Sequence, residues 1–209
     1  MTYHITLLRH GESLGNAGNY YQGQHDFDLS ARGEGQAQVL ADAWLAAGVT
    51  FDLVIASPLL RARRTAEIIA ARLGVALELD PDWKEIDNGV LAGLKQEEAD
   101  ALYPQPDFLN LYSPIGQSGE SDWDAFLRAG RAVARLLRRP PGCYLVVAHG
   151  AILNRALKAM LGIMPQANFH GTHFNFVNTG YIVLEYRPER HEWLVMKLSD
   201  QDHSPPTTA

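Results

Sequence analysis

The sequence predicts an α/β protein with a mostly parallel central sheet and helices on both faces. Short runs rich in Val, Ile and Leu alternate with longer segments of helical character, and this alternation is typical of parallel sheets. Apolar residues make up 46% of the 209 residues, which allows a sizeable core. No apolar run is long enough to span a bilayer. We therefore expect one domain over residues 1–209.

The elements follow in order along the chain. Buried strands are expected at residues 5–8, 53–56, 75–79 and 145–148. Helices are expected at residues 31–47, 58–73, 122–138 and 150–161. Ser30 would cap the first helix, and Ser57-Pro58 would supply the cap and the first-turn proline of the second. Residues 181–186 and 193–198 predict a terminal hairpin, and the polar tail 201–209 is expected to be disordered.

The stretch 87–119 is too long for a routine connection and contains several Pro and Gly residues. Long connections of this kind are often active-site lids, so we expect a lid here. No Gly-x-Gly-x-x-Gly follows a strand and no Walker A sequence is present, which disfavours the common nucleotide-binding sites.

Three of the predicted strands end in residues suited to phosphate chemistry. Arg9-His10-Gly11 follows the first strand, Ser57 to Arg61 the second, and His149-Gly150 the fourth. In a parallel sheet these ends share one edge, where ligands bind. An imidazole there can act as a nucleophile, a guanidinium matches two phosphoryl oxygens, and a helix after His149-Gly150 would aim backbone N–H groups at a phosphate.

The overall charge excludes some partners. The net charge is −6 and the isoelectric point about 5.7, which argues against a general nucleic-acid binder.

Cys143 is the only cysteine, and no basic segment precedes the first strand. A secretory signal is therefore not expected, and a cytoplasmic location is expected instead. The expected partner is a small phosphorylated substrate, with no nucleic acid and no membrane, and a homodimer is left open.

At this point the sequence closely resembles the histidine phosphatase superfamily, also called phosphoglycerate mutase-like. Four blocks match in order over about residues 4–161, which makes the resemblance specific for the superfamily but not for the substrate. The blocks are Leu7 to Ser13 with Asn16, Ser57 to Ala66 with Arg61 and Thr65, Glu85 to Gly89, and Val146 to Gly150.

The resemblance implies a role for each matching position. His10 would be the nucleophile that becomes phosphorylated, and Glu85 would be the general acid and then the base that activates water. Arg9, Arg61 and His149 would surround the phosphoryl group, with Gly150 at the adjoining helix start. Asn16 and the loop at Gln22-Gly23 would add hydrogen bonds. Two arginines and a second histidine already supply positive charge, so neither metal nor cofactor is expected.

Several readings compete with these roles. Glu85 lies in a charged stretch, so a solvent-facing carboxylate is the alternative for it, and Glu12 could cap or pair locally. His170 and His173 have a spacing that suggests metal binding, but no carboxylate or cysteine cluster accompanies them. Some aromatic residues could line the pocket mouth or simply pack in the core or lid: Tyr20, Tyr21, Phe27, Phe108 and Tyr112.

The segment 87–119 separates two enzyme classes. Similarity to cofactor-dependent phosphoglycerate mutases would imply a long basic insertion between the acid and the second histidine, yet Lys95 is the only basic residue in 87–119, against five acidic ones. We therefore favour a phosphatase acting on a small phosphomonoester, with a phosphomutase as the alternative. A phosphopeptide-binding module without catalysis is disfavoured, because a binder would need only the arginines.

Overall fold

The computed structural model describes residues 1–200 and 203–204, and a six-stranded sheet forms the centre of this part of the chain. The strand order is β3-β2-β4-β1-β5-β6. The first four are parallel: β1 (Tyr3–Arg9), β2 (Leu53–Ala56), β3 (Leu77–Leu79) and β4 (Cys143–Ala148). The hairpin of β5 (Tyr181–Arg187) and β6 (Glu192–Ser199) adds antiparallel strands at one edge. The predicted mostly parallel sheet and the terminal hairpin are confirmed.

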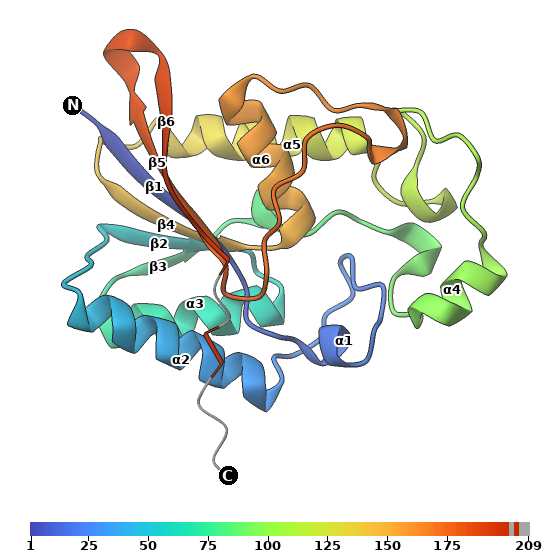
Figure 1. The fold of residues 1–209 in the computed structure, drawn as a ribbon, viewed down its shortest axis with the longest axis horizontal. Helices are drawn as coiled ribbons and strands as arrows, with labels where there is room; N and C mark the ends of the chain where they lie inside the picture. Colours follow the sequence, from blue (N-terminus) through green and yellow to red (C-terminus); the bar gives the residue numbers. More distant parts are fainter. Residues whose placement is uncertain (201–202, 205–209) are drawn as a thin grey trace.

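Helices cover both faces of the sheet, as predicted. In Figure 1, α2 (Ala31–Ala46) and α3 (Leu60–Leu73) lie on one face, and α5 (Asp122–Leu136) and α6 (Gly150–Leu161) on the other. Successive strand residues point to opposite faces. Leu7 therefore packs in the core beneath α5 and α6, while Leu8 packs in the core beneath α2 and α3.

The start of α3 corrects the sequence prediction. Ser57-Pro58 were expected to cap and open this helix, but it begins at Leu60, and Ser57 Oγ contacts His149 instead. The cap comes from a distant loop, because the Leu60 N–H donates to Asp26 Oδ1 at 2.7 Å. The cap predicted at Ser30 is confirmed, since its side chain accepts from the Gly33 N–H. The third strand is shorter than expected, at Leu77–Leu79.

The predicted lid region lies between β3 and α5, beyond the carboxyl ends of the parallel strands (Figure 1). It contains α4 (Gln96–Leu102) and the short 3-10 helices η2 (Gly89–Leu91) and η3 (Ile115–Gln117), after η1 (Pro81–Trp83). The loop with α1 (Leu14–Ala17) lies at the same end of the sheet. The remaining short helices are η4 (Ala167–Phe169) and η5 (Pro188–Arg190).

None of the helices in residues 1–200 and 203–204 is both long and apolar enough to cross a bilayer. The prediction of a disordered tail falls largely on residues 201–202 and 205–209, which lie outside the described part of the chain.

Candidate active site

A cavity of about 530 Å³ opens at the carboxyl edge of the parallel strands. Six of the nine predicted site residues line it: Arg9, His10, Gln22, Gly23, Arg61 and Glu85. The other lining residues are Tyr20, Tyr21, Ile86, Asn88, Leu91, Gln105, Ile115, Ala151, Arg155 and Phe169. The structure therefore brings together residues from three of the four matched blocks and from the loop at Gln22-Gly23.

His10 follows β1 and is almost fully buried, with 2% of its surface exposed. Its Nδ1 lies 2.6 Å from the Gly11 carbonyl oxygen. A carbonyl can only accept, so Nδ1 carries the proton and the Nε2 lone pair is left as the nucleophile. Burial, followed by the charges of Arg61 and Arg9, lowers the pKa of His10 well below its usual value. The neutral, nucleophilic form therefore predominates at neutral pH.

The turn after His10 depends on close backbone packing. A Cβ on Gly11 would lie 2.4 Å from the Gly33 carbonyl oxygen at the start of α2, so a side chain there would force the two segments apart. The Gly11 N–H donates to Thr65 Oγ1 of α3 at 3.1 Å. These contacts fix the turn relative to both helices on this face of the sheet.

Two arginines, the buried Arg61 and the partly buried Arg9, face this end of the sheet with incompletely satisfied guanidinium groups. Arg9 donates to the Phe176 carbonyl at 2.6 Å, and Arg61 to the Gly23 and His25 carbonyls at 2.7 and 3.0 Å. The Nε of each is buried without a hydrogen-bond partner. Burial lowers the pKa of Arg9, and that of Arg61 to about 10, while Glu85 opposes both shifts. Arg61 therefore stays charged at neutral pH, and the unpaired donors favour an anion.

His149 is a further histidine of the site, and it is fully buried. It precedes α6, has no exposed surface, and its ring centroid lies 5.1 Å from that of His10. Ser57 Oγ accepts from the Leu59 N–H at 3.3 Å and lies 2.8 Å from His149 Nε2. If Ser57 donates its hydroxyl proton to Nε2, Nδ1 bears the ring proton. That Nδ1 is buried without a partner. Burial and the nearby Arg61 lower the pKa of His149 well below its usual value. His149 is therefore neutral at neutral pH, which corrects the expectation that it adds positive charge to the site.

Glu85 is fixed by the N-terminus of α6. Its Oε1 accepts from the N–H groups of Ile86 and Ile152 at 2.9 and 3.0 Å, and its Oε2 accepts from Ala151 at 3.2 Å. This corrects the expectation that the first N–H groups of this helix would face a phosphate, because two of them bind Glu85. With a single partner, Oε2 has the more room for a proton.

The remaining predicted residues take different places. The Gln22 side chain accepts from Ser13 Oγ at 2.7 Å, and Gly23 has a positive φ of 48° while its carbonyl holds Arg61. Asn16 belongs to the capping box of α1, and its Oδ1 accepts from the Ser13 N–H. Gly150 is the first residue of α6. Neither Asn16, His149 nor Gly150 is among the described lining residues, so their contact with substrate stays a prediction.

The outer cavity is mainly apolar and amide-lined. Of the five aromatic residues considered from the sequence, Tyr20 and Tyr21 line it, whereas Phe108 and Tyr112 are 64% and 69% exposed. Besides Arg9 and Arg61, the described lining residues include one more arginine, Arg155. Its guanidinium is paired with the buried Asp122 at 2.5 Å. This pairing lowers the net positive charge available to a second anionic group.

Some contributors have no local sequence signal. Thr65 lies within a matched block, but its contact with Gly11 depends on α3 crossing the β1 turn. Asn178 donates to the His10 carbonyl at 3.1 Å, and Arg128 binds the segment that carries Glu85. These two contacts join residues far apart in sequence, and neither side chain lies in a recognisable motif. Glu12 pairs locally with Ser30 and Arg32.

Within the described residues, no three His, Cys, Asp or Glu side chains gather in a group that could hold a metal ion. His173 instead contacts the Phe169 carbonyl. The exposed Arg63 and Arg64 pair with Glu67 and Glu34 on the solvent side of α3, whereas Arg61 is buried.

The fold and the site together define an α/β protein with a buried anion-binding site at the carboxyl edge of its parallel strands. Residues 5–199 match the histidine phosphatase superfamily (branch 1). The chain therefore belongs to this superfamily, and the resemblance inferred from its motifs is confirmed. The similar proteins described next include a phosphatase and a probable mutase.

Curated relatives and solved structures are similar over most of their lengths. The chain is 35% identical over 170 residues to the probable phosphoglycerate mutase GpmB of Enterobacter sp. (strain 638), which covers 78% of this chain and 77% of the relative. A mycobacterial glucosyl-3-phosphoglycerate phosphatase in complex with VO3 superposes with a TM-score of 0.80 at 25% identity, covering 95% of this chain and 100% of that chain. Bacillus stearothermophilus YhfR gives a TM-score of 0.80 at 26% identity, covering 96% and 98%.

Proposed function

We propose that the protein is a metal-independent phosphatase that hydrolyses a small phosphomonoester through a phosphohistidine on His10. The observation that carries the proposal is the set of unpartnered buried nitrogens, Arg9 Nε, Arg61 Nε and His149 Nδ1, around a histidine whose Nε2 is left as the nucleophile. The two arginine Nε–H groups are donors, and His149 Nδ1 is a donor in the tautomer that accepts from Ser57; buried donors without partners are costly unless a ligand completes them. A phosphoryl group would do so and would place its phosphorus near Nε2.

A cytoplasmic location belongs to the same proposal, on the ground of the single cysteine.

The proposed reaction has two steps. In the first, His10 Nε2 attacks phosphorus, the bond from phosphorus to the leaving oxygen breaks, and Glu85 gives that oxygen a proton. In the second, Glu85 takes a proton from water, the water oxygen attacks phosphorus, and inorganic phosphate leaves with His10 restored. Arg9, Arg61 and His149 stabilise the charge on the phosphoryl oxygens, which supplies most of the catalysis in such transfers.

The charge of the outer cavity favours hydrolysis over a mutase reaction. A mutase must hold a second phosphate, but the further lining cation, Arg155, is paired with Asp122, and the segment 87–119 has Lys95 as its only basic residue. The mycobacterial phosphatase, which has a similar fold and was solved in complex with VO3, supports assignment to the phosphatase class. The runner-up is a phosphomutase, supported by the relatives called probable phosphoglycerate mutases.

A panel of phosphomonoesters tests the proposal. Phosphate release from sugar phosphates, phosphorylated cofactor precursors and phosphoamino acids would be measured beside a mutase assay that contains 2,3-bisphosphoglycerate. We expect release from at least one monoester to exceed isomerisation of 3-phosphoglycerate by at least about 10²-fold in kcat/KM, a difference of about 2.7 kcal/mol in transition-state stabilisation. Efficient isomerisation with negligible phosphate release would favour the mutase instead.

Activity should survive removal of metal ions. Arg9 and Arg61 supply the positive charge that metal ions supply in many other phosphoryl-transfer enzymes, so dialysis against EDTA should leave kcat within about two-fold. The measurement is phosphate release before and after dialysis, with Mg²⁺ and Zn²⁺ added back separately. Loss of turnover on chelation and its recovery with one metal would contradict this account of the charges.

A further inference from the structure

The backbone that carries Glu85 has no strand partner. The segment 82–85 begins within η1 and continues beyond it, and it is anchored by Trp83, whose side chain is fully buried in the core beneath α5 and α6. Backbone carbonyls that leave a sheet or helix need other donors when they are covered. Three carbonyls of this segment accept hydrogen bonds from the same side chain, which lies on α5.

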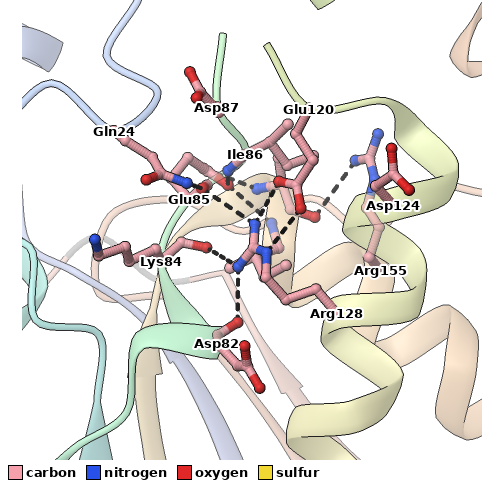
Figure 2. A network of polar contacts seen from close by, with 12 residues as sticks. Gln24, Asp82, Lys84, Glu85, Ile86, Asp87, Glu120, Asp124, Arg128 and Arg155 are labelled. Atoms are coloured by element: carbon pink, nitrogen blue, oxygen red, sulfur yellow. Dashed lines mark hydrogen bonds and ion pairs between the residues drawn. The ribbon is translucent and has the colours of Figure 1, made fainter. Parts of the chain in front are cut away.

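That side chain is Arg128, as Figure 2 shows. Its Nη1 donates to the carbonyls of Asp82 and Lys84 at 2.8 and 2.7 Å, and its Nη2 donates to the Glu85 carbonyl at 3.3 Å. Its Nε and Nη2 bind the two carboxylate oxygens of Glu120 at 2.8 and 2.7 Å. All five N–H donors of the guanidinium are therefore engaged.

This arrangement holds Glu85 from two sides. The N-terminus of α6 binds the carboxylate oxygens, while Arg128 and Gln24 bind the carbonyl of the same residue, Gln24 at 3.1 Å. Glu120 continues the connection, because its N–H donates to the Asp87 carbonyl at 2.9 Å, just after Glu85 in the chain. The Arg128–Glu120 ion pair is mostly covered, with 11% and 15% of the side chains exposed, so it is less screened than a surface pair.

We infer that Arg128 is a positioning residue for Glu85, and that its ion pair with Glu120 keeps the guanidinium turned toward the backbone of residues 82–85. The inference rests on the proposed acid role of Glu85 and goes beyond it by assigning the placement of that acid to a side chain that does not line the described cavity. Misplacement of a reacting group by about 1 Å can cost roughly 10²-fold in rate. A variant that moves this side chain but keeps its charge should therefore impair proton transfer and leave phosphate binding unchanged.

Lysine cannot replace this arginine. An ammonium has three donors and no planar fork, so Arg128→Lys keeps the charge but cannot serve three carbonyls and both Glu120 oxygens. Arg135→Lys is the matched control on the same helix. Arg135 reaches the same segment through the carboxylate of Asp82 and also pairs with the preceding Asp80, and 47% of its side chain is exposed. Exposed pairs of this kind contribute little.

The experiment is single-turnover phosphorylation of His10 by an alkyl phosphate and by p-nitrophenyl phosphate, whose leaving group needs little protonation. We expect Arg128→Lys to slow the alkyl reaction by roughly 10-fold or more and the aryl reaction by no more than about 2-fold. The affinity for vanadate should be unchanged, and Arg135→Lys should behave as the parent protein. Glu120→Gln should show the same contrast as Arg128→Lys, and it serves if the latter fails to fold.

Glu85→Gln, measured in parallel, separates the two claims. If Arg128 acts through Glu85, adding Arg128→Lys to Glu85→Gln should cause little further loss, because the two residues then act as a unit. Equal slowing of both substrates by Arg128→Lys, or full additivity in the double variant, overturns the positioning role while Glu85 keeps its own. No leaving-group contrast in Glu85→Gln itself overturns the proposed acid role and the positioning role with it.

Discussion

Replacing His10 with alanine should reduce kcat by at least about 10³-fold, because the covalent route needs the Nε2 lone pair. Water would then have to attack the bound ester directly. The remaining Arg9, Arg61 and His149 should still bind phosphate or vanadate, so KM should change much less than kcat. The measurement is steady-state hydrolysis of the best monoester from the panel, with vanadate affinity as the check that the site is intact.

His4→Ala is the matched control for this variant. His4 lies in β1, the strand that His10 directly follows. About half of its side chain is exposed, and its partner is Glu185. Its removal should leave kcat unchanged. A His10→Ala protein that keeps a tenth or more of the activity while binding vanadate normally would show that His10 is not the nucleophile.

Replacing Glu85 with glutamine should separate substrates by their leaving groups. An alkyl phosphate leaves as a strongly basic alkoxide and needs a proton, whereas p-nitrophenolate does not. Glu85→Gln should therefore slow phosphorylation of His10 by alkyl phosphates by roughly 10²-fold or more, and by aryl phosphates far less. Glutamine keeps the size of the side chain, but its amide NH₂ can no longer accept from the α6 N–H groups, so vanadate affinity and thermal unfolding are measured alongside.

Single-turnover measurement is essential to this comparison. Hydrolysis of phosphohistidine also uses Glu85 in the proposed mechanism, so steady-state rates would hide the contrast. If both substrates lose the same factor in the phosphorylation step, Glu85 is not the acid. Asp82 and Asp87 flank it in the same segment and would be the next carboxylates to replace.

The sheet and most of the helices could be predicted because their signals are local. The apolar run around Leu7 and Leu8 is read directly as a buried strand, and Ser30 caps its helix through a residue three positions away. The start of α3 could not be predicted, because its cap is Asp26, which comes from a loop far back in the chain. The nearby Ser57 was the stronger local signal, but its hydroxyl is used by His149.

The site was predictable to the extent that it follows strand ends. Arg9, His10 and Arg61 line the cavity as expected because parallel strands end at one edge. What the sequence could not give is the set of contacts that orient these groups. The Arg128 side chain reaches carbonyls more than forty positions away, and Ala151 and Ile152 bind Glu85 through their backbone N–H groups, for which no side-chain type is diagnostic.

Trapping the covalent intermediate tests the central claim most directly. The protein would be mixed with a fast aryl phosphate, quenched in base within a single turnover, digested under conditions that preserve phosphohistidine, and mapped by mass spectrometry. The account predicts one acid-labile phosphate on the peptide that contains His10, absent from His10→Ala and more abundant in Glu85→Gln if hydrolysis of the intermediate is slowed. Phosphate on any other residue, or none during turnover that is shown to be fast, would contradict it.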